Sequence, residues 1–228
     1  MPPAVRTTDG ASQDGPTRRT MYPLDPDGGG TWIAVNDLGL GLCLLNNYQA
    51  ADPRVERPTS RGELVRDLAE APDAAAVRAA LKGLDPGHFR GFQLLVLEPG
   101  EDTDESFVAF WDGVELRCVP LGEAPMPLIS SGFDLPRVER SRREVFERCV
   151  AEAGVLDTAV LSGYHGSTEP EPGPLAVLME RPDARTVSHT RVSVTRDEVW
   201  MHYMPVPEDL DGPVFGETVE VLRRTHRE

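Results

Sequence analysis

The clearest pattern in the chain is a pair of apolar runs, residues 31–35 and 40–45, joined by the polar turn Asn36-Asp37. Three glycines, residues 28–30, precede the first run. Short β-rich runs bounded by glycine and by an Asn-Asp turn are typical of a β-hairpin. The almost wholly apolar second run is typical of a buried strand. We therefore predict a hairpin whose second strand lies in the core.

Helical patterns follow this hairpin. Ser60 precedes an apolar stripe and has Glu63 three residues later, which is the spacing of a capping box. Asp73 precedes a second stripe in the same way, and Gly87 follows it. Pro136 is suited to the first turn of a third helix, which the apolar positions extend to residue 153. We also predict a helix from Glu217 to the polar end of the chain.

The remaining segments alternate between apolar runs and turn residues. Asp112-Gly113 is one of the strongest short hairpin signals. The predicted strands are residues 92–97, 106–111, 114–119, 126–131, 175–180, 186–195 and 199–203, with a loop over residues 161–174. This order predicts an α+β fold of antiparallel sheets covered by helices on their outer faces. Residues 1–27, rich in Pro, Gly and Asp, are predicted to be a loosely held leader, and residues 28–228 a single domain.

Composition limits the classes of partner. The net charge is −15 and the isoelectric point about 4.7, so the surface repels phosphate backbones and nucleic acid is not expected as a partner. Three widely spaced cysteines without a CxxC pair favour a reducing compartment. The sequence has no signal-peptide pattern and no apolar run long enough for a membrane helix. We predict a cytoplasmic protein that does not insert into membranes.

Several residues carry candidate chemistry, each with a simpler alternative. Cys43 and Cys118 lie in apolar strands, where a cysteine is usually a core residue. Arg61 either faces solvent at a helix start or holds a carboxylate there together with backbone N–H groups. His165, near Ser167, has no identifiable third group to orient it, although a histidine also suits a metal, haem iron or a polar ligand.

Six stretches, in order, resemble one family. They are Gly29 to Asn36 (GGTWIAVN), Leu44-Leu45-Asn46, Ser60-Arg61-Gly62, Phe92 to Leu97, Pro127 to Ser131, and Met179 to Ser188 (MERPDARTVS). Together they are similar to the family named after an Asn-Arg-Asp-Glu motif, also called the transport and Golgi organisation family. The resemblance covers the chain from about Tyr22 to Tyr203.

The resemblance implies an αββα sandwich of the N-terminal-nucleophile hydrolase type. Members with the full pattern begin Met-Cys, and the exposed cysteine would be both nucleophile and, through its α-amine, base. This sequence begins Met1-Pro2 and contains no Asn-Arg-Asp-Glu. We therefore expect, for the chain as written, a catalytically silent protein that binds a small metabolite of unknown identity. No cofactor or metal is assigned, and the oligomeric state stays open.

Two alternatives follow from the same resemblance. A native start upstream that supplies Met-Cys would make the protein a cysteine amidohydrolase acting on a small amide, with Asn46 or Thr31 near the oxyanion and Arg61 or Arg181 holding a carboxylate. Animal relatives are linked to haem or lipid handling, which makes haem or lipid a further ligand class. The full set of candidate site residues is Thr31, Trp32, Asn36, Asn46, Ser60, Arg61, Ser131, His165, Arg181 and Ser188.

Overall fold

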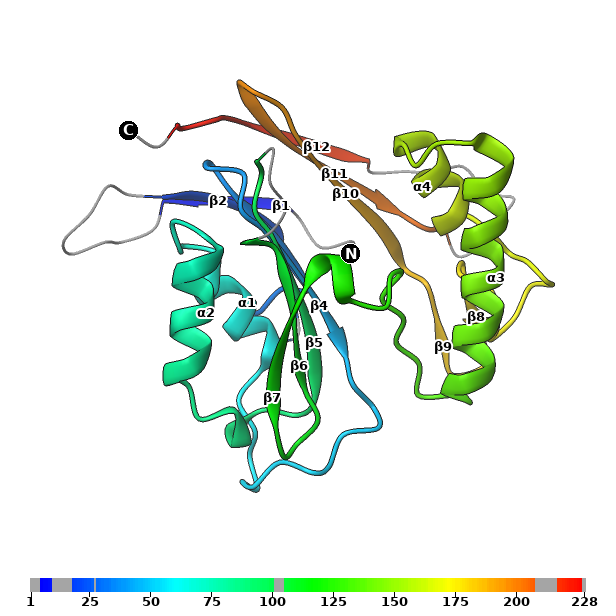
Figure 1. Ribbon diagram of the computed structural model, residues 1–228, viewed down its shortest axis with the longest axis horizontal. Helices are drawn as coiled ribbons and strands as arrows, with labels where there is room; N and C mark the ends of the chain where they lie inside the picture. The colour runs from blue at the N-terminus through cyan, green and yellow to red at the C-terminus, as the bar shows by residue number, and fades with distance from the viewer. Residues whose placement is uncertain (1–4, 10–17, 27, 101–104, 208–216, 227–228) are drawn as a thin grey trace. The chain divides into compact units, whose positions relative to one another are not determined.

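The computed structural model describes residues 5–9, 18–26, 28–100, 105–207 and 217–226 (Figure 1). The chain divides into two compact units. Unit 1 contains residues 1–124, 190–205 and 214–228, and unit 2 contains residues 125–189 and 206–213. Each unit is therefore assembled from segments that are distant in sequence. The single domain over residues 28–228 stays a prediction.

Unit 1 is built on a seven-stranded antiparallel sheet whose strands follow chain order. The predicted hairpin is confirmed, with Ile33 opposite Cys43, and so is the turn at Gly113, which has a φ of 90° that favours glycine. The strands are β1 (Val5–Asp9), β2 (Arg19–Pro23), β3 (Ile33–Asn36), β4 (Gly41–Asn46), β5 (Phe92–Leu97), β6 (Phe107–Trp111) and β7 (Leu116–Pro120).

Strands β1 and β2 lie within the segment where composition predicts a loosely held leader. They pair with each other from Val5 opposite Pro23 to Asp9 opposite Arg19, and β2 also pairs with β3. Met21 is fully buried and Tyr22 nearly so. The ordered strands differ from the predicted leader because two large apolar side chains pack in the core. The rest of that leader, apart from residues 18 and 24–26, lies outside the described residues.

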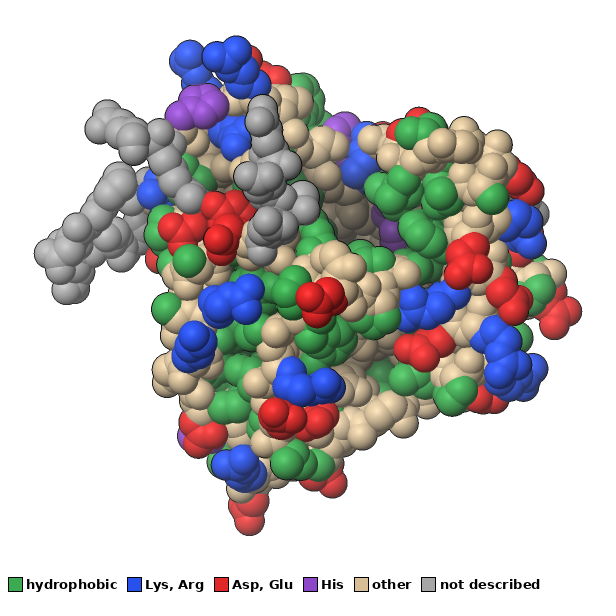
Figure 2. Space-filling model, in the orientation of Figure 1, with side chains coloured by type: hydrophobic (Ala, Val, Ile, Leu, Met, Phe, Trp, Pro, Cys, Tyr) green, Lys and Arg blue, Asp and Glu red, His purple; other side chains and the backbone are tan. Residues whose placement is uncertain are grey.

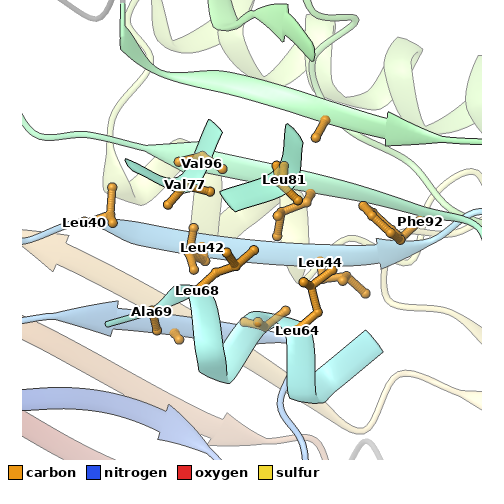
Figure 3. Packing of buried hydrophobic residues seen from close by; sticks show 14 of the residues in the cluster. Leu40, Leu42, Leu44, Leu64, Leu68, Ala69, Val77, Leu81, Phe92 and Val96 are labelled. Atoms are coloured by element: carbon orange, nitrogen blue, oxygen red, sulfur yellow. The ribbon is translucent and has the colours of Figure 1, made fainter. Parts of the chain in front are cut away.

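Helices α1 (Arg61–Leu68) and α2 (Ala74–Gly83) cover one face of this sheet. Both predicted caps are confirmed: the Ser60 hydroxyl accepts from the Gly62 N–H, and the Asp73 carboxylate accepts from the Ala76 N–H at 2.6 Å. Figure 3 shows the helix side chains directed at the apolar side chains of β4 and β5. The helix residues in this core include Leu64, Leu68, Val77 and Leu81, and the strand residues include Leu42, Leu44, Phe92 and Val96. A short 3-10 turn, η1 (Pro86–His88), leads into β5.

A second antiparallel sheet packs against the opposite face of the first. Its strands are β10 (Ser188–Val194), β11 (Glu198–Pro205) and β12 (Thr218–Arg223). The core between the sheets contains Met21 and Val35 from the first sheet and Val199, Met201 and Leu222 from the second. The described part of unit 1 therefore has three layers: helices, sheet and sheet.

The helix predicted from Glu217 is wrong, because this segment forms strand β12. Val219 and Val221 alternate with Thr218 and Glu220, a period of two that suits a strand, and Leu222 pairs opposite Val199. β-Branched residues favour this conformation over a short terminal helix.

Unit 2 contains helices α3 (Leu135–Ala153) and α4 (Thr158–His165) and the short strands β8 (Glu180–Arg181) and β9 (Ala184–Arg185). Phe146 and Tyr164 join the helices through an edge-to-face contact at 5.2 Å between ring centroids. The short turn η3 (Leu121–Glu123) lies at the end of the first segment of unit 1.

Three predictions in unit 2 are wrong. Residues 126–131 form no strand, since the prolines at 125 and 127 cannot donate to a β ladder. The predicted loop over residues 161–174 begins inside α4, which Asp157 caps by accepting from the Val160 N–H. Residues 175–179 are also not a strand; pairing is confined to β8 and β9.

The α+β class with antiparallel sheets is confirmed. Within the described ranges, no helix combines the length and the apolar character that crossing a bilayer would require.

Candidate functional site

A pocket of about 360 Å³ opens in unit 1 where β3 begins and β4 ends. It brings together five of the predicted site residues, three from the hairpin and two from the start of α1. The lining residues are Asp25, Thr31, Trp32, Leu44, Asn46, Pro58, Thr59, Ser60, Arg61, Gly62 and Arg90.

Two glycines hold the hairpin against the start of α1. A Cβ placed on Gly30 would lie 2.6 Å from the Cα of Gly62, and one on Gly62 would lie 2.7 Å from the Thr31 nitrogen. The Thr31 N–H donates to the Gly62 carbonyl at 3.2 Å. Only residues without a side chain permit this backbone contact. The glycines of the Gly-Gly-Thr-Trp and Ser-Arg-Gly motifs therefore meet, and the pocket forms beside their contact.

Arg61 and Arg90 give the pocket its positive charge. The Arg61 side chain is half-buried, and its Nη1 donates to the Gly91 carbonyl at 2.9 Å. Burial lowers the pKa of Arg61; Tyr48 raises it, and the like charge of Arg90 lowers it again. Arg90 is exposed and makes no hydrogen bond or ion pair with any described residue. Two guanidinium groups therefore repel each other at one pocket.

This local charge contrasts with the rest of the protein. The chain carries a net charge of −15, and acidic and basic side chains are interspersed over the visible face (Figure 2). Long-range electrostatics therefore do not concentrate anions at this protein, so any anion bound here is held by the two nearby arginines.

The uncharged polar residues of the pocket mainly shape its backbone. The Thr31 hydroxyl donates to the Ile33 carbonyl at 2.9 Å, and the Ser60 hydroxyl caps α1. Asn46 Nδ2 donates to the Tyr48 hydroxyl at 3.0 Å. These contacts hold the backbone of the pocket lining in place.

An aromatic and aliphatic wall completes the pocket. Trp32 and Leu44 belong to paired segments, since the Leu44 N–H donates to the Trp32 carbonyl at 2.7 Å. The indole also contacts the buried ring of Tyr203 on β11, with 6.5 Å between ring centroids. The second sheet thus supports the apolar wall from behind.

Asn36, also predicted as a site residue, has a structural role instead. It is fully buried, and Nδ2 donates to the carbonyls of Ala69 and Ala71 at 3.0 and 2.9 Å. Its Oδ1 accepts from the N–H groups of Leu38 and Leu40 at 3.0 and 3.1 Å. The protein itself therefore satisfies the whole hydrogen-bonding capacity of this amide.

The other four predicted site residues belong to unit 2 and do not line the pocket. Ser131 bonds to the backbone of Phe133, Arg181 lies 3.2 Å from a carboxylate oxygen of Asp183, and Ser188 begins β10. The ring of His165 stacks on that of His189 with 4.9 Å between centroids.

The environment of His165 keeps it uncharged at neutral pH. Tyr164 meets one edge of the imidazole and His189 stacks on it. Desolvation of the ring and the neighbouring His189 lower the pKa of His165 to about 4, even though the residue as a whole is exposed. The described residues contain no cluster of three or more His, Cys, Asp or Glu side chains that could hold a metal ion.

The cysteines of β4 and β7 are unsuited to nucleophilic chemistry. Cys43 is half-buried as a residue, yet desolvation around its thiol raises the pKa to about 11. Burial also raises the pKa of Cys118. Both thiols are therefore protonated at neutral pH, in agreement with their interpretation as core residues.

Sequence reasoning missed two charged residues of the pocket, Asp25 and Arg90. A signal for Arg90 does exist: β5 pairs with β4 so that Phe92 lies opposite Asn46, which brings the residues just before β5 to the polar end of the hairpin. Asp25 lies in the segment interpreted as a leader, where no local pattern predicts a site.

Comparison with known proteins finds one family. A family model described as Transport and Golgi organisation 2 matches residues 4–112, which include β1 to β6 and both helices of unit 1. No curated protein matches the chain. The match includes every residue that lines the pocket.

Proposed function

We propose that this chain, whose residues 4–112 match the Transport and Golgi organisation 2 family, binds a small organic anion in the pocket of unit 1. The observation that carries this proposal is the pair Arg61 and Arg90 in one pocket, with Arg90 making no ion pair to any described residue. A bound carboxylate relieves the repulsion between two like charges and gains charge-assisted hydrogen bonds.

The apolar residues of the lining indicate the rest of the ligand. Trp32, Leu44 and Pro58 offer apolar surface, and the volume of about 360 Å³ lies at the small end of the range typical of ligand pockets, roughly 300–1,000 Å³. A carboxylate attached to a small aromatic or aliphatic group fits both features. The ligand class is therefore a monocarboxylate with one compact apolar substituent.

The state of the cysteines supports binding rather than catalysis by the residues of this sequence. The pKa of Cys43 is raised to about 11, that of Cys118 is also raised, and the described pocket lining includes no cysteine. The amidohydrolase alternative needs a nucleophile supplied by an N-terminal cysteine ahead of Met1. It predicts amide turnover only in a chain that carries such a residue.

Haem does not fit the pocket. Haem iron is held by His, Cys, Met or Tyr side chains, and none of these residue types is among the described residues that line the pocket. His165 and His189 lie in unit 2. We therefore derive no haem-dependent step. Lipid handling and a fourth helical layer that would complete the αββα sandwich remain proposals from the resemblance. A cytoplasmic location remains a proposal from the composition of the sequence.

Calorimetric titration with a matched pair of probes tests the binding function. The probes are 3-phenylpropionate and its uncharged analogue 3-phenylpropionamide. We expect the carboxylate to bind and the amide to bind at least tenfold more weakly, because a hydrogen bond to a charged group is worth about 1.5–3 kcal/mol. Arg61→Gln and Arg90→Gln should each weaken carboxylate binding by about tenfold or more.

Arg117→Gln is the matched control, since Arg117 is an exposed arginine on β7 outside the pocket. It should leave binding unchanged. Equal affinity for the two probes, or equal affinity of the Arg61→Gln and parent proteins for the carboxylate, would overturn the proposed function. Turnover of 3-phenylpropionamide by a chain extended upstream to begin with Met-Cys, but not by this chain, would favour the amidohydrolase alternative.

A further inference from the structure

The second sheet of unit 1 has an open edge at β12 (Figure 1). Among the described strands, β12 pairs only with β11. An open edge presents a row of N–H and C=O groups, and proteins usually protect such a strand from pairing with another chain. The edge strand β7 of the first sheet has this protection, because it ends in Pro120. Strand β12 contains no proline.

The hydrogen-bond pattern shows which backbone groups face this edge. The Arg224 N–H donates to the Asp197 carbonyl at 2.7 Å, and the same register continues along the whole of β12. Because bonded and non-bonded pairs alternate in an antiparallel ladder, the even-numbered residues of β12 bond to β11. The backbone groups of Val219, Val221 and Arg223 therefore face away from β11.

The side chains beside this edge form an apolar and aromatic surface. Val219 and Val221 are 43% and 40% exposed, although valine is most often buried. On β11, Trp200 lies opposite Val221 and His202 opposite Val219. The indole and imidazole rings stack with 6.1 Å between their centroids. Four neighbouring side chains thus extend this surface from β11 to the open edge.

The charges of β12 differ from one end to the other. Glu217 precedes the strand and Arg223 ends it, and both residues are exposed. The Arg223 carbonyl accepts from the Arg19 guanidinium at 3.0 Å, which places a second cation at that end. A strand with an acid at one end and cations at the other is complementary to an antiparallel copy of itself.

We propose that β12 pairs antiparallel with β12 of a second copy of this chain, so that two three-stranded sheets become one six-stranded sheet. With the two-fold axis at Glu220, Val219 lies opposite Val221 of the partner subunit, and Glu217 lies opposite Arg223 of the partner subunit. A shift by two residues in either direction keeps the backbone pairing but separates these opposite charges. The inference goes beyond the proposed function and does not depend on the anion site.

Two features limit the strength of this dimer. Glu220 meets its own copy at the axis, and like charges directly opposite each other are destabilising. A strand pair is also small beside the interface area of about 1,200–2,000 Å² that is typical of stable complexes. We therefore expect a dissociation constant in the micromolar range.

Sedimentation velocity of the full chain at about 1–300 µM tests the pairing, and we expect a change from monomer to dimer. Arg223→Glu and Glu217→Arg should each weaken the dimer by about tenfold or more, because each places like charges opposite each other at two symmetric positions. The double variant Glu217→Arg/Arg223→Glu restores opposite charges. Its dissociation constant should return to within about threefold of the parent value.

Matched variants separate local pairing from net charge. Arg117→Glu changes an exposed arginine on β7 by the same charge as Arg223→Glu and should leave the dimer unchanged. Glu220→Gln removes the repulsion at the axis and should tighten the dimer by about threefold or more. Glu144→Gln, at an exposed position of α3, changes the net charge equally and should not tighten it. The unfolding temperature checks that each variant folds.

Three outcomes would overturn the inference. A parent chain that stays monomeric at every concentration excludes a second copy and leaves β12 to a strand of another protein or of the same chain. A dimer that neither single charge swap weakens forms through another surface. A dimer that both swaps weaken but the double variant does not restore lacks the proposed register.

Discussion

The two ends of β3 carry polar residues that look alike in the sequence but differ in the structure. At the first end, Thr31 and Trp32 line a pocket that also contains Arg61 and Arg90, whose guanidinium groups can donate hydrogen bonds to a ligand. At the second end, Asn36 is fully buried and makes four hydrogen bonds with the protein's own backbone. A polar residue at the end of an apolar strand therefore indicates a buried group that needs hydrogen-bond partners. Only the surrounding backbone decides whether the protein or a ligand supplies those partners.

Both ends serve to hold α1. The Gly30 and Gly62 backbones touch at the start of this helix, and Asn36 binds the carbonyls of Ala69 and Ala71 just after its end. A short helix with little stability of its own is thus fixed at two points to one strand. The pocket depends on this attachment because Ser60 and Arg61 enter it from the start of α1.

The largest expected effect is the loss of the Asn36 amide. Asn36→Leu leaves two backbone carbonyls and two backbone N–H groups without their partners in a buried site, and each such group costs about 1–3 kcal/mol. With partial relaxation, we expect the free energy of unfolding to fall by about 4 kcal/mol in urea titrations. Asn46→Leu, at the pocket end of the hairpin, is the control and should change it by less than about 1 kcal/mol. Equal losses of unfolding free energy in Asn36→Leu and Asn46→Leu would contradict the difference between the two ends of the hairpin.

The next effect tests the contact at the first end. Gly62→Ala places a Cβ 2.7 Å from the Thr31 nitrogen, so the hairpin and α1 must separate. We expect a loss of about 3 kcal/mol in unfolding free energy, the range of overpacking, together with loss of probe binding. Gly122→Ala is the control, since a Cβ there meets no atom within 4 Å. A stable Gly62→Ala variant that binds normally would show that the glycine contact does not form the pocket.

A smaller effect extends the comparison to unit 2. The pKa of His165 is lowered to about 4, below the ordinary value of 6.5, so the unfolded chain binds the proton more readily. The contribution of this neutral imidazole to the free energy of unfolding is fully present above about pH 6.5. It is lost as the pH falls towards 4. Because the residue is exposed and solvent screens its charge, we expect a loss of only about 1 kcal/mol, measured as the pH dependence of the free energy of unfolding. His165→Gln should flatten this part of the profile; an unchanged slope would assign it to other groups.

The smallest effect concerns the hydroxyl of Thr31. Its hydrogen bonds are local, to the backbone of Ile33 two residues away. Thr31→Val should therefore cost only about 0.5 kcal/mol of unfolding free energy, at the low end for a hydrogen bond. Binding of 3-phenylpropionate should stay within about twofold of the parent, because the arginines hold the carboxylate. A large loss of affinity would give the Thr31 hydroxyl a direct part in ligand binding.

Local signals predicted the first half of unit 1 well. The hairpins at Asn36-Asp37 and Asp112-Gly113 and the helix caps at Ser60 and Asp73 depend on residues next to one another in sequence. The predicted site residues that do meet, such as Thr31 and Arg61, lie in segments with such signals. Their meeting itself depends on the contact of Gly30 with Gly62, which links residues far apart in the sequence.

Where long-range partners decide the structure, the sequence was less informative. Residues 218–223 became a strand because β11 supplies the pairing, and β2 is ordered because Met21 packs against the second sheet. Arg90 reaches the pocket through the pairing of β5 with β4, and Asp25 lies on the loop after β2; no local pattern predicts either position. Short segments of this kind leave the choice between helix and strand to tertiary packing.

The core between the two sheets also has a consequence for synthesis of the protein. Met21 and Val35 emerge early from the ribosome, whereas their partners Val199 and Leu222 lie near the other end of the chain. At about 5–20 residues per second, the apolar face of the first sheet stays uncovered for on the order of ten seconds. Residues 4–112, which contain the family match and the whole pocket, therefore need either a chaperone or delayed folding until β11 and β12 have been made.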